Sequence, residues 1–149
     1  MPNRIYRGPQ DRQPKTVSSK TVAGAYLPGT FVTEGASTLT QATAFAPGLR
    51  LLGNRDFYSD GALTATDPLL TAYASGDTGV AFKIEPGQEY QAAMAAATYT
   101  YMQELTVGAS GRLAAASTGN VVVAFAKAAG AKSAGDLMDV EISNHYAKA

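Results

Sequence analysis

Few side chains in this 149-residue chain could carry out catalysis, and they lie far apart. The one histidine, His145, is near the C-terminus, where chains are commonly mobile. A metal site or an activated nucleophile needs several convergent groups, so His145 alone predicts neither. The chain has no cysteine, which excludes disulfides and thiolate metal ligands.

Three carboxylates gather in residues 54–67 (NRDFYSDGALTATD). Asp56, Asp60 and Asp67 could pair as general acid and base or offer oxygens to Ca²⁺, although the spacing lacks the alternating ligands and terminal Glu of an EF-hand loop. No nucleophile elbow, Walker motif or dinucleotide glycine motif is present. A solvated acidic loop is the favoured interpretation. We therefore expect a protein that is not an enzyme and holds no metal or cofactor.

Charge is divided unevenly along the chain. Residues 1–20 carry five cations and one carboxylate, a net charge of +4, whereas residues 21–149 carry seven basic and eleven acidic side chains, a net charge of −4. Such a polar segment buries too little apolar surface to order itself alone. The pattern predicts an extended basic N-terminal arm over 1–20, ordered against a partner, and a single β domain over 21–149.

The partner expected for this arm is an acidic protein surface, including that of a neighbouring copy. Nucleic acid is disfavoured because the arm has one aromatic residue and the rest of the chain would repel a polyanion. The contact residues expected in the arm are Arg4, Tyr6, Arg7, Arg12, Lys15 and Lys20.

The remainder of the chain alternates short apolar runs with Gly, Pro, Asp and Asn at intervals of about 8 to 15 residues, which indicates an all-β sandwich or barrel. The expected strands are Val22–Leu27, Thr30–Thr33, Leu49–Leu52, Leu69–Ala74, Val80–Ile84, Glu89–Ala95, Thr98–Leu105, Arg112–Ala115, Val121–Ala126 and Leu137–Ser143.

Two segments leave alternatives open. Residues 88–105 are rich in alanine and permit a helix, but the alternation around Tyr99 and Tyr101 favours strands. Residues 54–67 have no clear period and predict a long surface loop. Four apolar residues in or beside that loop are candidates either for an interface or for the core. They are Phe57, Tyr58, Leu63 and Leu69.

The N-terminus lacks the layout of a secretory signal, and no segment approaches the length of about 18 apolar residues that a membrane span requires. We expect a soluble protein with no membrane partner.

A family resemblance emerges from residues 73–143. YASGDTGV at 73–80 and IEPGQEYQAAMA at 84–95 are followed by LTVGASGRL at 105–113, GNVVVAFA at 119–126 and AGDLMDVEI at 134–142. This succession of turns and strands resembles the small head-decoration, or cement, proteins of tailed bacteriophages.

The resemblance implies a β-barrel or β-tulip-like domain with an N-terminal arm that lies on the capsid. It implies a structural virion protein, made in the host cytoplasm, that binds the outside of the mature capsid and stabilises it. Its implied partners are the major capsid protein and copies of itself, with a trimer favoured over a dimer. The alternatives are another virion β-domain, in a tail tube, neck or fibre, and a glycan-binding module that stacks sugars on Tyr58, Tyr73, Tyr99 or Tyr101.

Overall fold

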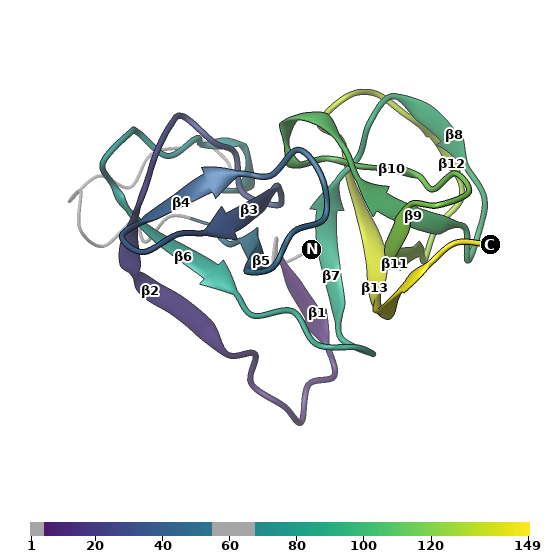
Figure 1. Ribbon diagram of the computed structural model, residues 1–149, viewed down its shortest axis with the longest axis horizontal. Coiled ribbons are helices and arrows are strands. Elements are labelled where there is room, and N and C mark those ends of the chain that lie inside the picture. Colours follow the sequence, from purple (N-terminus) through teal and green to yellow (C-terminus); the bar gives the residue numbers. More distant parts are fainter. Residues whose placement is uncertain (1–4, 55–67) are drawn as a thin grey trace.

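Two β-rich lobes lie side by side in the computed structural model, which describes residues 5–54 and 68–149 (Figure 1). The barrel lobe is a closed five-stranded barrel with the order β2-β4-β3-β5-β6. The sheet lobe is a six-stranded sheet, β1-β7-β13-β11-β9-β10, accompanied by the two-stranded sheet β12-β8. This confirms the all-β, barrel-containing fold class that the sequence predicts.

The elements follow one another in short segments. They are β1 (Tyr6–Gly8), β2 (Thr16–Val22), β3 (Phe31–Glu34), β4 (Thr38–Gln41), β5 (Leu49–Leu52), the 3₁₀ turn η2 (Pro68–Leu70), β6 (Thr78–Phe82), β7 (Glu89–Ala93), β8 (Ala97–Tyr99), β9 (Glu104–Val107), the 3₁₀ turn η3 (Ala109–Gly111), β10 (Leu113–Ala115), β11 (Val121–Ala126), β12 (Gly130–Lys132) and β13 (Leu137–Ala147). None of the helical segments in the described ranges has the length and apolar character needed to span a bilayer.

Paired apolar residues in the barrel strands explain how the two lobes are held together. Neighbouring side chains on a strand point to opposite faces. In β3, Val32 packs in the barrel interior while Phe31 belongs to the larger core shared with the sheet lobe. In β5, Leu52 packs in the barrel interior and Leu51 belongs to the larger core. All four side chains are fully buried. Both faces of these strands are therefore covered, and the larger core is continuous across the lobes.

Residues 88–105 form strands, as the period-two pattern predicts, and not the alternative helix. The expected strand Thr98–Leu105 is divided into β8 and β9 by a turn. Met102 adopts a positive φ of 61° there, and the Gln103 side chain accepts a hydrogen bond from the Thr100 N–H at 2.8 Å.

Two expected strands are wrong. The chain leaves the barrel at Val22 and bends through residues 23–27, so Val22–Leu27 is not a strand. Leu69–Ala74 is not a strand either, because Pro68–Leu70 form η2, with Pro68 at the first position, where its missing N–H is tolerated, and residues 71–74 are irregular. Tyr73 is buried beyond this turn and donates a hydrogen bond from its hydroxyl to the Gly53 carbonyl at 2.9 Å.

The extended N-terminal arm is not confirmed. Residues 6–8 pair with β7, and β2 pairs with both β6 and β4, so β2 runs across the expected boundary between residues 20 and 21. Ile5 is 1% exposed and Val17 is 7% exposed. These apolar side chains fix a segment that charge counting alone describes as polar.

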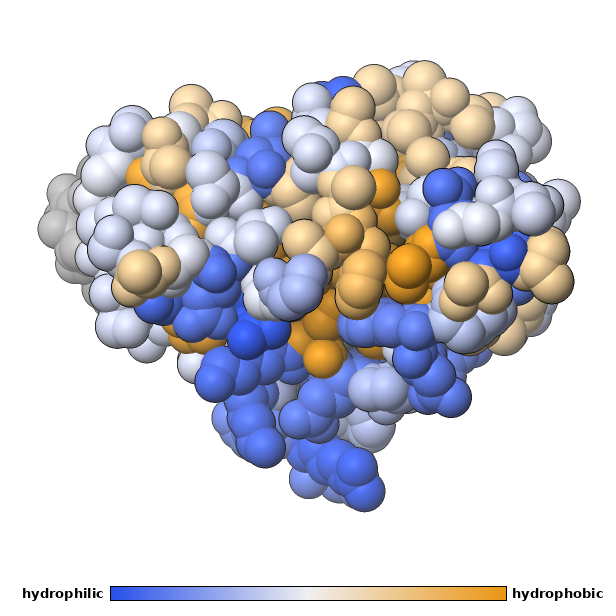
Figure 2. Space-filling model, viewed as in Figure 1, coloured by the Kyte–Doolittle hydropathy of each residue, from blue (hydrophilic) through white to orange (hydrophobic). Residues whose placement is uncertain are grey.

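Within the N-terminal segment, the connection between β1 and β2 is not packed on the rest of the chain in this way. It projects from the lower end of the molecule (Figure 1). It spans residues 9–15, and the lower tip of the surface in Figure 2 is strongly hydrophilic. Apolar residues gather instead in the middle of the same face, where the two lobes meet.

Candidate interaction surfaces

Most of the cations expected to contact a partner are used within the chain. Arg7 Nε lies 3.2 Å from Asp139 Oδ1, and its Nη2 donates to Asp139 Oδ2 at 3.5 Å. Lys15 Nζ lies 3.8 Å from Glu85 Oε1 in a highly exposed pair. The positive segment therefore pairs with carboxylates of its own chain, and the contact of Arg7 and Lys15 with a partner stays a prediction.

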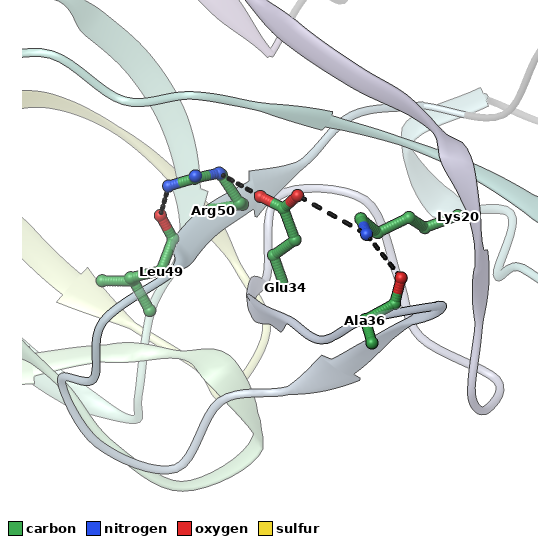
Figure 3. A network of polar contacts seen from close by, with 5 residues as sticks. All are labelled: Lys20, Glu34, Ala36, Leu49 and Arg50. Atoms are coloured by element: carbon green, nitrogen blue, oxygen red, sulfur yellow. Dashed lines mark hydrogen bonds and ion pairs between the residues drawn. The ribbon is translucent and has the colours of Figure 1, made fainter.

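Lys20 belongs to a network that joins three barrel strands (Figure 3). Glu34 on β3 accepts a hydrogen bond from Arg50 Nε on β5 at 2.9 Å, and its other carboxylate oxygen lies 3.8 Å from Lys20 Nζ on β2. Lys20 also donates to the Ala36 carbonyl at 2.8 Å. All three charged side chains are less than 25% exposed, so Lys20 is a structural residue of the barrel.

Neutralising Glu34 is expected to weaken the barrel measurably. Glu34→Gln leaves two half-buried cations facing an amide, and we expect the free energy of unfolding to fall by about 1–3 kcal/mol. Glu85→Gln is the matched control, because its exposed pair with Lys15 should contribute less than about 1 kcal/mol. Urea unfolding of both variants measures the difference; equal losses would contradict a specific role for the network.

Tyr6 on β1 and Arg12 in the projecting connection have different roles. The Tyr6 hydroxyl lies 2.6 Å from the Pro9 carbonyl oxygen and 2.9 Å from that of Arg12, both of which are acceptors. Its ring packs edge-on against Tyr90, with centroids 5.3 Å apart, and burial raises the pKa of Tyr6. Tyr6 therefore shapes the turn. The Arg12 side chain is exposed and has no ion pair with any residue that the structure describes.

The expected interface loop is only partly within the described residues. Phe57, Tyr58 and Leu63 lie outside them, as do Arg4 and the carboxylates Asp56, Asp60 and Asp67. Leu69 is 3% exposed and belongs to the core, which settles its two interpretations in favour of packing. Its neighbour Leu70 is 67% exposed. Sequence reasoning missed Leu70 because a 3₁₀ turn replaces the expected strand alternation.

The aromatic residues considered for sugar stacking are mostly unavailable. Tyr73 and Tyr99 are buried at 2% and 1% exposure, and Tyr58 lies outside the described ranges. Tyr101 is 61% exposed, with Lys127 Nζ 5.6 Å from its ring centroid. Within the described part of the chain, no three His, Cys, Asp or Glu side chains converge as metal ligands would.

His145 is fixed in β13 rather than in a mobile tail, and it connects the lobes. Its ring lies 5.3 Å, centroid to centroid, from Phe45 on the β4–β5 connection. Its backbone has a positive φ of 54°, and its N–H donates to Ser143 Oγ at 3.1 Å. The Nε2 atom is buried without a hydrogen-bond partner in the described structure, and burial lowers the pKa of the imidazole from 6.5.

This burial predicts a pH-dependent stability. The unfolded chain binds a proton on His145 more readily than the folded chain, so the free energy of unfolding is largest above about pH 6.5 and falls as the pH drops below it. His145→Asn keeps a residue that tolerates positive φ but cannot titrate. Thermal melts from about pH 7.5 to 5.5 should show a smaller decrease for this variant. An identical pH dependence in both proteins would contradict the burial argument.

A small groove where the lobes meet is the feature that sequence reasoning did not find. It has a volume of about 180 Å³ and is lined by residues of both lobes, including Leu27, Leu69, Leu70, Arg112 and Leu137. These five residues come from four separate segments, so no local sequence pattern marks the groove. The Arg112 side chain is half-buried there.

Comparison of the sequence with protein-family models and with curated proteins finds no match. Among solved structures, the chain is similar to the N base of the head fibre protein gp8.5 of bacteriophage phi29. The similarity covers 92% of this chain and 100% of that chain, with a TM-score of 0.54 and 11% sequence identity. At this identity, the similarity establishes a shared fold.

Proposed function

We propose that this chain is a structural protein of a tailed-bacteriophage virion that binds the outer surface of the mature head. The observation that carries the proposal is the fold similarity to the base of a phage head fibre, which extends over nearly the whole of this chain and all of the other. The turn-and-strand pattern of residues 73–143, which resembles phage head-decoration proteins, supports it independently.

The proposed mechanism is stabilisation by selective binding. A mature capsid presents many equivalent junctions between subunits, and a protein that binds this lattice alone stabilises it by mass action. The partners would be the major capsid protein and sister copies, with a trimer favoured over a dimer. The role requires neither catalysis nor a cofactor.

Because Arg7, Lys15 and Lys20 are paired within the chain, the proposed contact with the capsid depends less on ion pairs than the sequence suggests. Exposed ion pairs contribute only about 0–1 kcal/mol each, so apolar contacts must supply most of the affinity. Arg12 at the projecting tip remains available for a contact with a partner.

The fold similarity also favours a second candidate, in which this chain is the base that holds a fibre on the head. In both candidate roles the chain binds the head, and the two roles differ in whether the bound chain also carries a fibre. A decoration protein is complete once bound, whereas a base must also hold a second polypeptide on bound heads.

Heat release of DNA tests the proposal directly. Heads that lack this protein should rupture at a lower temperature than heads to which the purified protein has been added back, because each bound copy favours the mature lattice. Co-sedimentation of the protein with heads, compared with naked DNA at the same salt concentration, is the matched control. Equal heat resistance would exclude stabilisation, and equal binding to naked DNA would replace the capsid with nucleic acid as partner.

A further inference from the structure

Arg112 differs from the other half-buried arginines in having no anionic partner. Arg7 pairs with Asp139 and Arg50 pairs with Glu34, but the side chain of Arg112 makes no ion pair or hydrogen bond to any described residue. A guanidinium that loses water without gaining a carboxylate is destabilising. An anionic group brought by another molecule would offset this cost.

Two hydrogen bonds fix the backbone at Arg112. Its N–H donates to the Ala109 carbonyl at 3.3 Å, and its carbonyl accepts from the Gly108 N–H at 2.8 Å. A Cβ at Gly135 would lie 3.8 Å from Arg112 Nη2. Arg112 thus lines the groove from a closed turn, next to a glycine that has no side chain to cover the guanidinium.

The rest of the groove is suited to aliphatic groups. Leu27 is 37% exposed and Leu70 is 67% exposed, while Leu69 and Leu137 are more deeply placed. The enclosed volume of about 180 Å³ is smaller than the roughly 300–1,000 Å³ of sites for drug-sized ligands. It can accommodate one or two side chains of a peptide.

We propose that this groove binds an acidic, aliphatic peptide segment of another virion protein, which places a carboxylate on Arg112 and an aliphatic side chain against the leucines. The carboxylate is favoured by charge complementarity, and the aliphatic side chain by the apolar lining. Both anchors are needed, because an exposed ion pair alone contributes little affinity. The assignment of the partner to the virion rests on the proposed function, whereas the chemistry of the groove does not.

A pair of synthetic peptides tests that chemistry without any capsid. The probe is acetyl-Ser-Leu-Asp-Leu-Ser-amide, and the control peptide has Asn in place of Asp. In NMR titrations to about 10 mM, we expect the Asp peptide to shift the methyl signals of Leu27, Leu70 and Leu137 with at least about fivefold higher affinity than the Asn peptide.

Arg112→Gln should abolish this preference, whereas Arg12→Gln, which neutralises an exposed and unpaired arginine, should retain it. Thermal melts of both variants establish that they are folded. The proposal is overturned if the wild type binds neither peptide, binds both equally, or keeps its preference after Arg112→Gln.

Binding to purified heads identifies the source of the peptide. Arg112→Gln should lower the affinity for heads by at least about tenfold relative to the wild type. Equal binding of this variant and the wild type would overturn the assignment of the groove to a virion partner. If the wild type binds no heads but retains the peptide preference, the proposed function fails while the groove chemistry stands. Self-association that depends on Arg112 in sedimentation experiments would make a second copy the occupant and overturn the proposed one.

Discussion

Deletion of residues 1–20 is expected to abolish the folded state. The truncated chain loses most of β2, which closes the barrel by pairing with both β4 and β6, and loses β1 at the edge of the six-stranded sheet. The deletion also removes Ile5 and Val17, which are both buried. The open barrel would expose its interior and unpaired backbone groups, at a cost comparable to the total stability of about 5–15 kcal/mol of an ordinary domain.

Circular dichroism and thermal unfolding of the truncated chain measure this effect. The matched control is a full-length variant with Arg7, Arg12, Lys15 and Lys20 changed to Gln, which removes the net positive charge of residues 1–20 but keeps both strands. It should be destabilised and still unfold cooperatively. A truncated protein that melts cooperatively within about 10 °C of wild type would show that residues 1–20 are a dispensable arm.

Gly111→Ala is expected to produce the largest loss of stability among single substitutions at turn glycines. Gly111 has a positive φ of 65°, and a Cβ there would press on the Phe31 carbonyl oxygen and lie 2.9 Å from the Phe31 nitrogen. These are backbone atoms of β3 at the junction of the lobes, which cannot rotate away. We expect overlap to cost about 1–3 kcal/mol in addition to about 1–2 kcal/mol for the left-handed backbone.

Gly119→Ala separates these two contributions. Gly119 has a similar φ of 86°, but a Cβ there meets no atom within 4 Å. This variant should lose only the conformational term of about 1–2 kcal/mol. Denaturant unfolding of the two variants gives the comparison, and equal losses would mean that the approach of η3 to β3 relaxes easily.

Several strands could be predicted because local residues define both of their ends. Leu49–Leu52 and Val121–Ala126 are found with the predicted bounds, since each is an apolar run between turn residues. In residues 88–105, the alternating pattern correctly predicted strands, although the many alanines favour a helix. The type and the ends of these strands depend on neighbouring residues, so they can be predicted from the sequence.

The N-terminal segment and the groove could not be predicted because both depend on distant contacts. Arg7 and Asp139 are 132 residues apart, and charge counting cannot reveal that they pair. A division of charge between two segments is equally consistent with contact between copies and contact within one chain. From the sequence, Arg112 was only the first residue of the expected strand Arg112–Ala115, since its lack of a partner becomes evident when the surrounding loops are in place.

Image reconstruction of native phage particles is the measurement that tests the proposed location most directly. Difference density between wild-type particles and particles lacking this gene product should appear at repeated positions on the outer surface of the head, and the two-lobed chain should fit within it (Figure 1). Density confined to the tail or neck, or no difference between the two particles, would contradict a protein that binds the outside of the mature head.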